Sequence, residues 1–346
     1  MRVAVVWNSD HMGVINRFGQ PNLEGASRET VNGVVAALHE RGHEALLCEG
    51  DKGLLTALER FMPPDPQARP SGMVFNMAYG IQGECRYTHV PAMLELAGVP
   101  YTGSSPLGHG LALDKVITKR LIRDGGVPTP KFRVMRRGTE GTGDLRFPVV
   151  VKPRHESTSF GLQLVHEPAH LRQAVELIVT QYAQDALVEE YIEGREITVA
   201  LLGNGELEVL PLVEQDFGDR ETRLMDWDAK FVAAVAVPKI CPAQIESGLE
   251  TMLRDISVAT FRACLCRDYA RVDLRIDGSG QPFVLEINSM ASLDKRDSYV
   301  LAAMTAGHSF PILVDRILDV AHIRYFGTAS PRPNTRRNTD GCLLLD

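Results

Sequence analysis

The sequence predicts an α/β protein of two or three domains, with α and β segments mixed along the whole chain. Short apolar runs that suit buried strands alternate with segments whose apolar residues recur at helical spacing. A chain of 346 residues is also long for a single domain. Its 44% hydrophobic and 23% charged residues are an ordinary globular composition, with enough apolar side chains for sizeable cores.

The first hundred residues predict a Rossmann-like α/β domain over residues 1–107. Residues 3–7 are an apolar strand, the apolar residues of 31–38 have helical spacing, and 45–48 form a second strand. A strand at 73–76 and a helix around 93–97 follow. No Gly-x-Gly-x-x-Gly follows the first strand, which argues against the usual dinucleotide-binding form of this fold.

The remaining segments predict two further domains, over residues 108–188 and 189–326. The first holds a helix at 114–124, a strand at 147–152, a polar loop, a helix at 171–182 and a strand at 186–190. The second holds strands at 196–202 and 207–213, a helix at 246–263, a hairpin at 271–288 and a last helix at 309–324. Residues 327–346 show no periodicity and are predicted to be a disordered tail.

Charge and composition argue against several classes of partner. The 37 basic and 44 acidic residues give a net charge of −7, and no long basic run provides a surface for nucleic acid or an anionic membrane. No apolar stretch reaches membrane-spanning length, and the first residues lack a secretory cleavage pattern, so we expect a cytoplasmic protein.

The six cysteines are scattered along the chain and lack the spacing of a zinc site. They lie at positions 48, 85, 241, 264, 266 and 342. Only Cys264 and Cys266 lie close together, and these two have neither a Cys-x-x-Cys partner nor a nearby histidine. The sequence therefore predicts buried free thiols in a reducing compartment.

The hairpin at 271–288 carries the strongest chemical signal. A turn, Asp277-Gly-Ser-Gly280, joins two strands of alternating apolar and polar residues. Arg271 and Asp273 share one face of the first strand, and Glu286 and Asn288 share one face of the second. If the two faces coincide, hard oxygen donors suited to Mg²⁺ beside phosphates meet there. The alternative is an amphipathic hairpin with a solvated polar face.

Two lysines and a hydroxyl-rich loop suit phosphate binding. Lys115 begins a predicted helix, and Lys152 ends the apolar strand Pro148-Val-Val-Val-Lys-Pro153 just before a proline break. A lysine there acts as a point charge toward phosphate oxygens, although a strand-end lysine that reaches water is the alternative. The loop that follows could close over phosphates with its hydroxyl and backbone N–H groups, through Ser157, Thr158, Ser159 and Gly161.

The segment 188–196 suits a nucleoside, and a further cation follows it. Its strand ends in Glu189, Glu190, Tyr191 and Ile192, which offer backbone groups and an aromatic wall to an adenine ring. Glu196 could accept hydrogen bonds from ribose hydroxyls. A solvated acidic turn is the alternative. Lys230 adds a cation in a loop-like segment ahead of the hairpin.

Taken in order, these segments resemble the ATP-grasp superfamily and, within it, the D-alanine–D-alanine ligase family. The resemblance runs from about residue 3 to residue 318. It is specific through the order of its parts: Pro100-Tyr-Thr-Gly-Ser104, Leu113-Asp-Lys115, Pro148-Val-Val-Val-Lys-Pro153, Val188-Glu-Glu-Tyr-Ile-Glu-Gly-Arg-Glu196, Ala229-Lys-Phe231, Cys241-Pro-Ala243, Arg271-Val-Asp273 and Leu285-Glu-Ile-Asn288. It implies an ATP-grasp fold in which two subdomains follow the N-terminal domain.

The resemblance also implies a role for each candidate residue. Lys115 and Lys152 would contact the phosphates of ATP, and Lys230 would contact its terminal phosphate region. The loop Ser157, Thr158, Ser159 and Gly161 would cover the phosphates, Glu189, Glu190, Tyr191 and Ile192 would line the adenine pocket, and Glu196 would bind the ribose. Asp273, Glu286 and Asn288 would hold two Mg²⁺ (or Mn²⁺), Arg271 would stabilise the acyl-phosphate, Glu24 would anchor an amino group, and Thr158, Ser292, Asp297 and Ser298 would contact amino-acid substrates.

Three departures from the family pattern fall in the regions expected to touch the amino-acid substrates. The loop reads Glu156-Ser-Thr-Ser-Phe-Gly161, with Ser157 where glycine is usual. The segment after Asn288 has Ser292 where glycine is expected and four charged residues at 294–297. Residues 79–86 lack the usual histidine and paired glycines.

These departures leave more than one function open. The leading expectation is an ADP-forming ligase that joins two amino acids through an acyl-phosphate. The first alternative is the same chemistry on other amino-acid or peptide substrates in specialised metabolism. The second is a catalytically silent nucleotide-binding regulator. The resemblance also allows a homodimer through the first domain.

Overall fold

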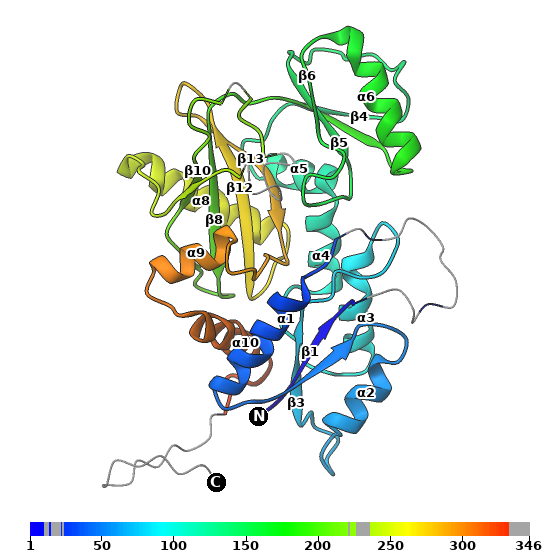
Figure 1. The fold of residues 1–346 in the computed structure, drawn as a ribbon, viewed down its shortest axis with the longest axis vertical. Helices are drawn as coiled ribbons and strands as arrows, with labels where there is room; N and C mark the ends of the chain where they lie inside the picture. The colour runs from blue at the N-terminus through cyan, green and yellow to red at the C-terminus, as the bar shows by residue number, and fades with distance from the viewer. Residues whose placement is uncertain (10–13, 15–21, 23, 221, 226–235, 332–346) are drawn as a thin grey trace.

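The computed structural model places the strands in three separate sheets (Figure 1). It describes residues 1–9, 14, 22, 24–220, 222–225 and 236–331. The three sheets follow one another along the chain, and each contains strands from one of the three predicted regions. The bounds of the domains themselves remain a prediction.

The first sheet is parallel and has the strand order β2-β1-β3. Its strands are β1 (Arg2–Trp7), β2 (Glu44–Glu49) and β3 (Gly72–Asn76). Ser27 caps helix α1 (Arg28–Glu40) by accepting a hydrogen bond from the backbone N–H of Thr30. Helix α2 (Leu54–Phe61), the short helix η1 (Arg86–Thr88) and helix α3 (His89–Leu96) follow. The predicted α/β alternation is confirmed in this region.

Two helices and a four-stranded antiparallel sheet form the middle of the chain. Helix α4 (Pro106–Leu113), which the sequence did not predict, leads to α5 (Lys115–Asp124). Asp114 caps α5 by accepting from the backbone N–H groups of Val116 and Ile117. The sheet has the order β4-β7-β5-β6. Its strands are β4 (Phe132–Met135), β5 (Val149–Pro153), β6 (Gln163–Val165) and β7 (Ala186–Glu190), and helix α6 (Pro168–Gln181) packs on it.

The third sheet has six strands and carries the predicted hairpin. Its path is β11-β10-β8-β12-β13, with β9 paired to β8. The strands are β8 (Arg195–Leu202), β9 (Glu208–Val209), β10 (Val213–Gln215), β11 (Lys239–Ile240), β12 (Tyr269–Ile276) and β13 (Pro282–Asn288). The strand predicted at 207–213 is therefore interrupted: it contains β9 and only the first residue of β10. Helix α8 (Ser247–Ala263) covers one face.

The last two helices join the first and third sheets through one apolar core. Helices α9 (Ser298–Thr305) and α10 (Phe310–Phe326) contribute Tyr299 and Ile317 to it. Phe75 of β3 and Leu202 of β8 lie in the same core, and both are fully or almost fully buried. Burial of this apolar surface holds the amino-terminal sheet against the sheet that carries the hairpin (Figure 1).

The ends and the thiols complete the fold. Gly327 ends α10 in a left-handed conformation, and the buried Ser330 donates its backbone N–H to Asp319 Oδ1 at 2.9 Å. Residues 332–346 of the predicted tail lie outside the described residues. No helix in the described part of the chain is long and apolar enough to cross a membrane. Cys48, Cys264 and Cys266 are buried free thiols as predicted, whereas the prediction is wrong for the exposed Cys85.

Candidate functional site

The polar faces of the two hairpin strands coincide, which is the arrangement that the sequence had left open. In the antiparallel ladder Asp273 lies opposite Glu286, and Arg271 lies opposite Asn288. A register shift follows Asp273, next to these pairs. On the other side of β12, Thr198 of β8 lies opposite Asp273 and donates its hydroxyl to Asp273 Oδ1 at 3.0 Å. Side chains of three neighbouring strands therefore meet on one rigid floor.

Asp273 is the centre of the hydrogen bonds on this floor. Arg271 donates to both of its oxygens, from Nε at 3.1 Å and from Nη2 at 3.0 Å, and Asn288 Nδ2 donates to Oδ2 at 2.9 Å. Arg271 Nη1 also donates to Asp297 at 3.0 Å. Burial alone would lower the pKa of Arg271, but Asp273 and Asp297 raise it above its ordinary value, so the guanidinium is firmly charged.

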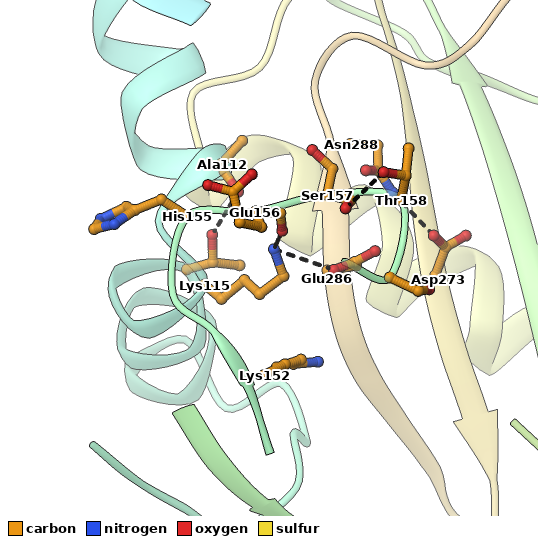
Figure 2. A network of polar contacts seen from close by, with 12 residues as sticks. Ala112, Lys115, Lys152, His155, Glu156, Ser157, Thr158, Asp273, Glu286 and Asn288 are labelled. Atoms are coloured by element: carbon orange, nitrogen blue, oxygen red, sulfur yellow. Dashed lines mark hydrogen bonds and ion pairs between the residues drawn. The ribbon is translucent and has the colours of Figure 1, made fainter. Parts of the chain in front are cut away.

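Lys115 faces Glu286 from the first turn of α5. Its Nζ lies 3.6 Å from Glu286 Oε2 and donates to the backbone oxygen of Glu156, so the lysine connects the hairpin to the loop after β5 (Figure 2). Burial lowers the pKa of Lys115, and Glu286 opposes that shift. The structure thus brings Lys115 to the predicted metal face, although Glu286 lies 171 positions further along the sequence.

Two further lysines hold Glu189 in the interior. Lys152 Nζ lies 2.5 Å from Glu189 Oε1, and Lys119 Nζ lies 2.8 Å from Oε2. Burial favours the neutral acid, but Lys119 and Lys152 together hold the pKa of Glu189 below its ordinary value. Sequence reasoning missed Lys119. Its position one helical turn after Lys115 was the signal that could have found it, because residues four apart share a helix face.

The loop after Lys152 adopts a conformation that the sequence did not predict. Thr158 and Ser159 have φ values of 54° and 63°, in the left-handed region that L-residues seldom adopt, and Gly161 has a φ of 69°. Ser157, which stands where the family usually has glycine, does not have a positive φ, and the left-handed conformation falls on the next two residues. Ser159 Oγ donates to the backbone oxygen of Met225 at 2.6 Å, which fastens the loop to the segment ahead of Lys230.

Glu24 lies in a partly buried group of hydroxyls. Ser157 Oγ donates to Glu24 Oε2 at 2.5 Å, Tyr87 also donates to Oε2, and the two hydroxyls are 2.9 Å apart. Arg86 Nη2 is 4.0 Å from Glu24 and 3.2 Å from Glu156. Burial raises the pKa of Glu24 despite these donors. Tyr87 was not predicted, because its segment lacks any family motif.

The residues predicted around the nucleoside separate into two groups. Tyr191 donates its hydroxyl to the backbone oxygen of Arg223 at 3.0 Å, and Ile192 is buried. Glu196 lies opposite Arg275 in the sheet. Glu190 is different, since its carboxylate accepts from Arg146 Nη2 at 2.8 Å and alternation turns it away from Glu189.

Two of the predicted substrate residues, Asp297 and Ser298, lie at the start of α9, and Ser292 lies in the segment before it. Asp297 caps the helix by accepting from the backbone N–H of Ser298 at 2.6 Å, and it also binds Arg271. Ser298 Oγ accepts from Gln215 at 3.3 Å, and Ser292 Oγ accepts from the backbone N–H of Asp294 at 3.2 Å. Among the charged residues at 294–297, Asp297 therefore stabilises the local structure. Lys230 lies outside the described residues.

The donor set of the floor fits a hard divalent cation. Within the described residues there is no cluster of three or more histidine, cysteine, aspartate or glutamate side chains arranged to hold a metal ion. The predicted set is instead two carboxylates and one amide, from Asp273, Glu286 and Asn288. Carboxylate and amide oxygens without sulfur or imidazole are the chemistry of Mg²⁺, which also keeps water and phosphate oxygens as ligands.

His109 lies beneath this region, and its burial predicts a pH dependence of stability. The side chain is fully buried, its Nδ1 is 2.8 Å from Ser289 Oγ, and burial lowers its pKa to about 3. The unfolded chain takes up a proton on this histidine below its ordinary pKa of about 6.5, but the folded chain does not. The free energy of unfolding should therefore fall as the pH drops from 6.5 toward 3, by up to about 1.4 kcal/mol per pH unit from this group.

We expect His109→Gln to make the pH dependence shallower by about one proton between pH 6.5 and pH 4. Urea unfolding at half-unit pH steps measures that slope. His170→Gln on the exposed surface of α6 is the control and should keep the parent slope. An unchanged slope in His109→Gln would show that the histidine is not held neutral.

Comparisons with known proteins give the class and the family. Residues 121–319, more than half of the chain, match the family model described as D-ala D-ala ligase C-terminus. A D-alanine–D-alanine ligase from Moorella thermoacetica is 31% identical over 88% of this chain and 97% of its own length. An uncharacterized protein, y4sG, from Sinorhizobium fredii is 72% identical over 94% of this chain and 98% of its own length.

Solved structures agree on the fold. A D-alanine–D-alanine ligase from Bacillus anthracis complexed with ATP superposes with a TM-score of 0.73 at 23% identity, over 94% of this chain and 98% of its own. The VanG D-Ala:D-Ser ligase from Enterococcus faecalis gives 0.70 at 21% identity, over 92% and 99%. The fold is thus that of an ATP-grasp protein. The chain belongs to the D-alanine–D-alanine ligase family and is an ATP-dependent ligase that forms carbon–nitrogen bonds.

Proposed function

We propose that this enzyme joins two amino acids through an acyl-phosphate and releases ADP and phosphate. The observation that carries the proposal is the floor of Asp273, Glu286 and Asn288 with Lys115 beside it. The name of the Moorella relative supports D-alanine as the first substrate to test. We also propose that Asp273, Glu286 and Asn288 would hold two Mg²⁺.

The proposed first step transfers the terminal phosphoryl group of ATP to a substrate carboxylate. A carboxylate is a poor electrophile, and phosphorylation turns one of its oxygens into a good leaving group. Lys115 and Lys152, now paired with Glu286 and Glu189, would turn toward the phosphate oxygens and offset their charge. Mg²⁺ bound at the floor would add further charge neutralisation and fix the phosphate geometry.

In the proposed second step a neutral amine attacks the carbonyl carbon of the acyl-phosphate, and phosphate leaves. Arg271 is charged and rigidly held, so it can stabilise the developing oxyanion without reorganising. The loop of Ser157 and Ser159, tied to Glu24 and Met225, would exclude water from an intermediate that hydrolyses readily. Glu24 would hold the ammonium group of the first substrate.

A second set of substrates is favoured by the surroundings of Arg271. Arg271 forms an ion pair with Asp297, and Asp297 belongs to the segment proposed to contact the amino-acid substrates. The fold is also similar to that of a D-Ala:D-Ser ligase, a protein whose name gives D-serine as a substrate beside D-alanine. The alternative is therefore the same ligation with other amino-acid or peptide acceptors. We also propose that the protein forms a homodimer. The roles given above to individual residues in binding adenine, ribose and the amino-acid substrates are likewise part of this proposal.

The test is a ligation screen with Mg²⁺ and ATP, read by ADP release and product mass. We expect ADP release that requires both an amino-acid donor and an acceptor, with D-alanine tested alone and against mixed D- and L-amino acids. If D-alanyl-D-alanine were the only product formed from the mixed amino acids, the alternative acceptors would be excluded as the main substrates. ADP release with no amino acid, at the same rate as with the full panel, would contradict ligation, and silence on every substrate would favour a nucleotide-binding regulator.

A further inference from the structure

Arg275 is a buried cation on the floor of the site that no step above uses. It follows Arg271 and Asp273 at two-residue intervals on β12, so the three side chains share a face. Arg275 is among the largest fully buried side chains of the protein, with an exposed fraction of 2%. A charged side chain so deeply buried calls for partners that offset the loss of water.

The protein supplies only some of those partners. Arg275 Nη2 donates to the backbone oxygens of Arg223 at 2.6 Å and Gly194 at 3.2 Å. The guanidinium carbon lies 4.7 Å from the ring centroid of Tyr191, within cation–π range, and Nε lies 3.9 Å from Glu196 Oε2. Nε and Nη1 make no hydrogen bond within the part of the chain that the structure describes.

The unpaired donors lie in a row of polar side chains that crosses three strands. Arg275 of β12 is opposite Glu196 of β8, which is opposite Gln215 of β10. Gln215 is also buried, and its Oε1 has no hydrogen-bond partner among the described residues. Buried polar groups are almost always paired in native proteins, because an unmet hydrogen bond in the interior is costly. Unmet donors and an unmet acceptor on either side of Glu196 indicate a polar ligand there.

We propose that Arg275 is a positioning residue for the ribose of the bound nucleotide. This proposal rests on the proposed function, in which Tyr191 and Glu196 surround the nucleoside. The free N–H groups of Arg275 donate to ribose oxygens, beside Glu196 as the acceptor for a ribose hydroxyl. Its stacking on Tyr191 and its bonds to Arg223 hold the walls of that pocket at a fixed distance.

The experiment compares ADP with 2′-deoxy-ADP and 3′-deoxy-ADP in the full-length protein by calorimetry. We expect the parent to prefer ADP over at least one deoxy analogue by about 10- to 100-fold, as for hydrogen bonds to charged groups. Arg275→Met should bind ADP more weakly and reduce that preference to about threefold or less. If Arg275 had a purely structural role, the substitution would lower the affinity for all three nucleotides by the same factor.

The control is Arg195→Met. Arg195 pairs with Glu214 at 2.7 Å on the opposite face of β8 and should leave the preference unchanged. If Arg275→Met does not fold, Arg275→Lys carries the test, with a preference at least threefold smaller than the parent's. An unchanged preference in either folded variant, or a parent that does not distinguish the deoxy analogues, overturns the proposal. A parent that binds no adenine nucleotide overturns the proposed function as well, so the two failures are distinguishable.

Discussion

Replacing Glu286 with glutamine should abolish ligation while the fold stays intact. The substitution keeps the size of the side chain and removes the charge that faces Lys115 and that the proposed cations require. We expect the turnover number to fall by at least about 10²- to 10³-fold, the range found when one electrostatic group of an active site is removed. Steady-state ADP release at saturating Mg²⁺ and circular dichroism measure the two effects.

Glu206→Gln is the matched control for this prediction. Glu206 is exposed in the turn between β8 and β9 of the same sheet and should tolerate the same chemical change. Parent-like turnover in Glu286→Gln would show that the carboxylate holds no essential cation. Loss of turnover together with loss of the folded circular dichroism signal would show a structural role instead.

Replacing Lys119 with methionine should cause a large loss of stability. Its ammonium is fully buried and lies 2.8 Å from both Glu189 Oε2 and Thr129 Oγ1, while burial lowers its pKa to about 8. Without it, Glu189 keeps only Lys152 as a partner. Removing one partner of a buried ion pair typically costs about 3–5 kcal/mol, because the remaining charge stays in the interior. Urea unfolding of the variant measures this loss.

The reason for that loss can be tested separately. In a Glu189→Gln background the carboxylate is absent, so Lys119→Met should cost clearly less than it does in the parent. Lys131→Met, which breaks an exposed pair with Asp144 at 2.8 Å, should cost less than about 1 kcal/mol. Additive losses in the double variant would contradict the account of a buried charge network.

The sequence predicted the hairpin floor well, because its signals are local. Alternation placed Asp273 and Glu286 on defined faces of their strands, and the structure shows that these faces coincide. Lys115 and Lys152 were predicted for the same reason, since one lies at the start of a helix and the other near the end of a strand. Family resemblance then supplied the expectation that these parts meet.

Contacts between distant segments could not be predicted in this way. Tyr87 meets Ser157 and Glu24 only because the first sheet and the loop after β5 come together in the fold. Helix α9 was missed because its buried residues surround it and leave no clear amphipathic period, while charged residues precede it. The left-handed conformation of Thr158 and Ser159 is imposed by the loop's neighbours, not by the preference of these residues.

The central claim is that the hairpin floor binds divalent cations that position the phosphates of ATP. A crystal structure with Mn²⁺ and a non-hydrolysable ATP analogue, collected at a wavelength where manganese scatters anomalously, tests it directly. We expect anomalous peaks within ligand distance of Asp273, Glu286 and Asn288, with Lys115 and Lys152 turned from Glu286 and Glu189 onto phosphate oxygens. A bound nucleotide with no peak beside these oxygens, and with both lysines still paired to the glutamates, would contradict the account.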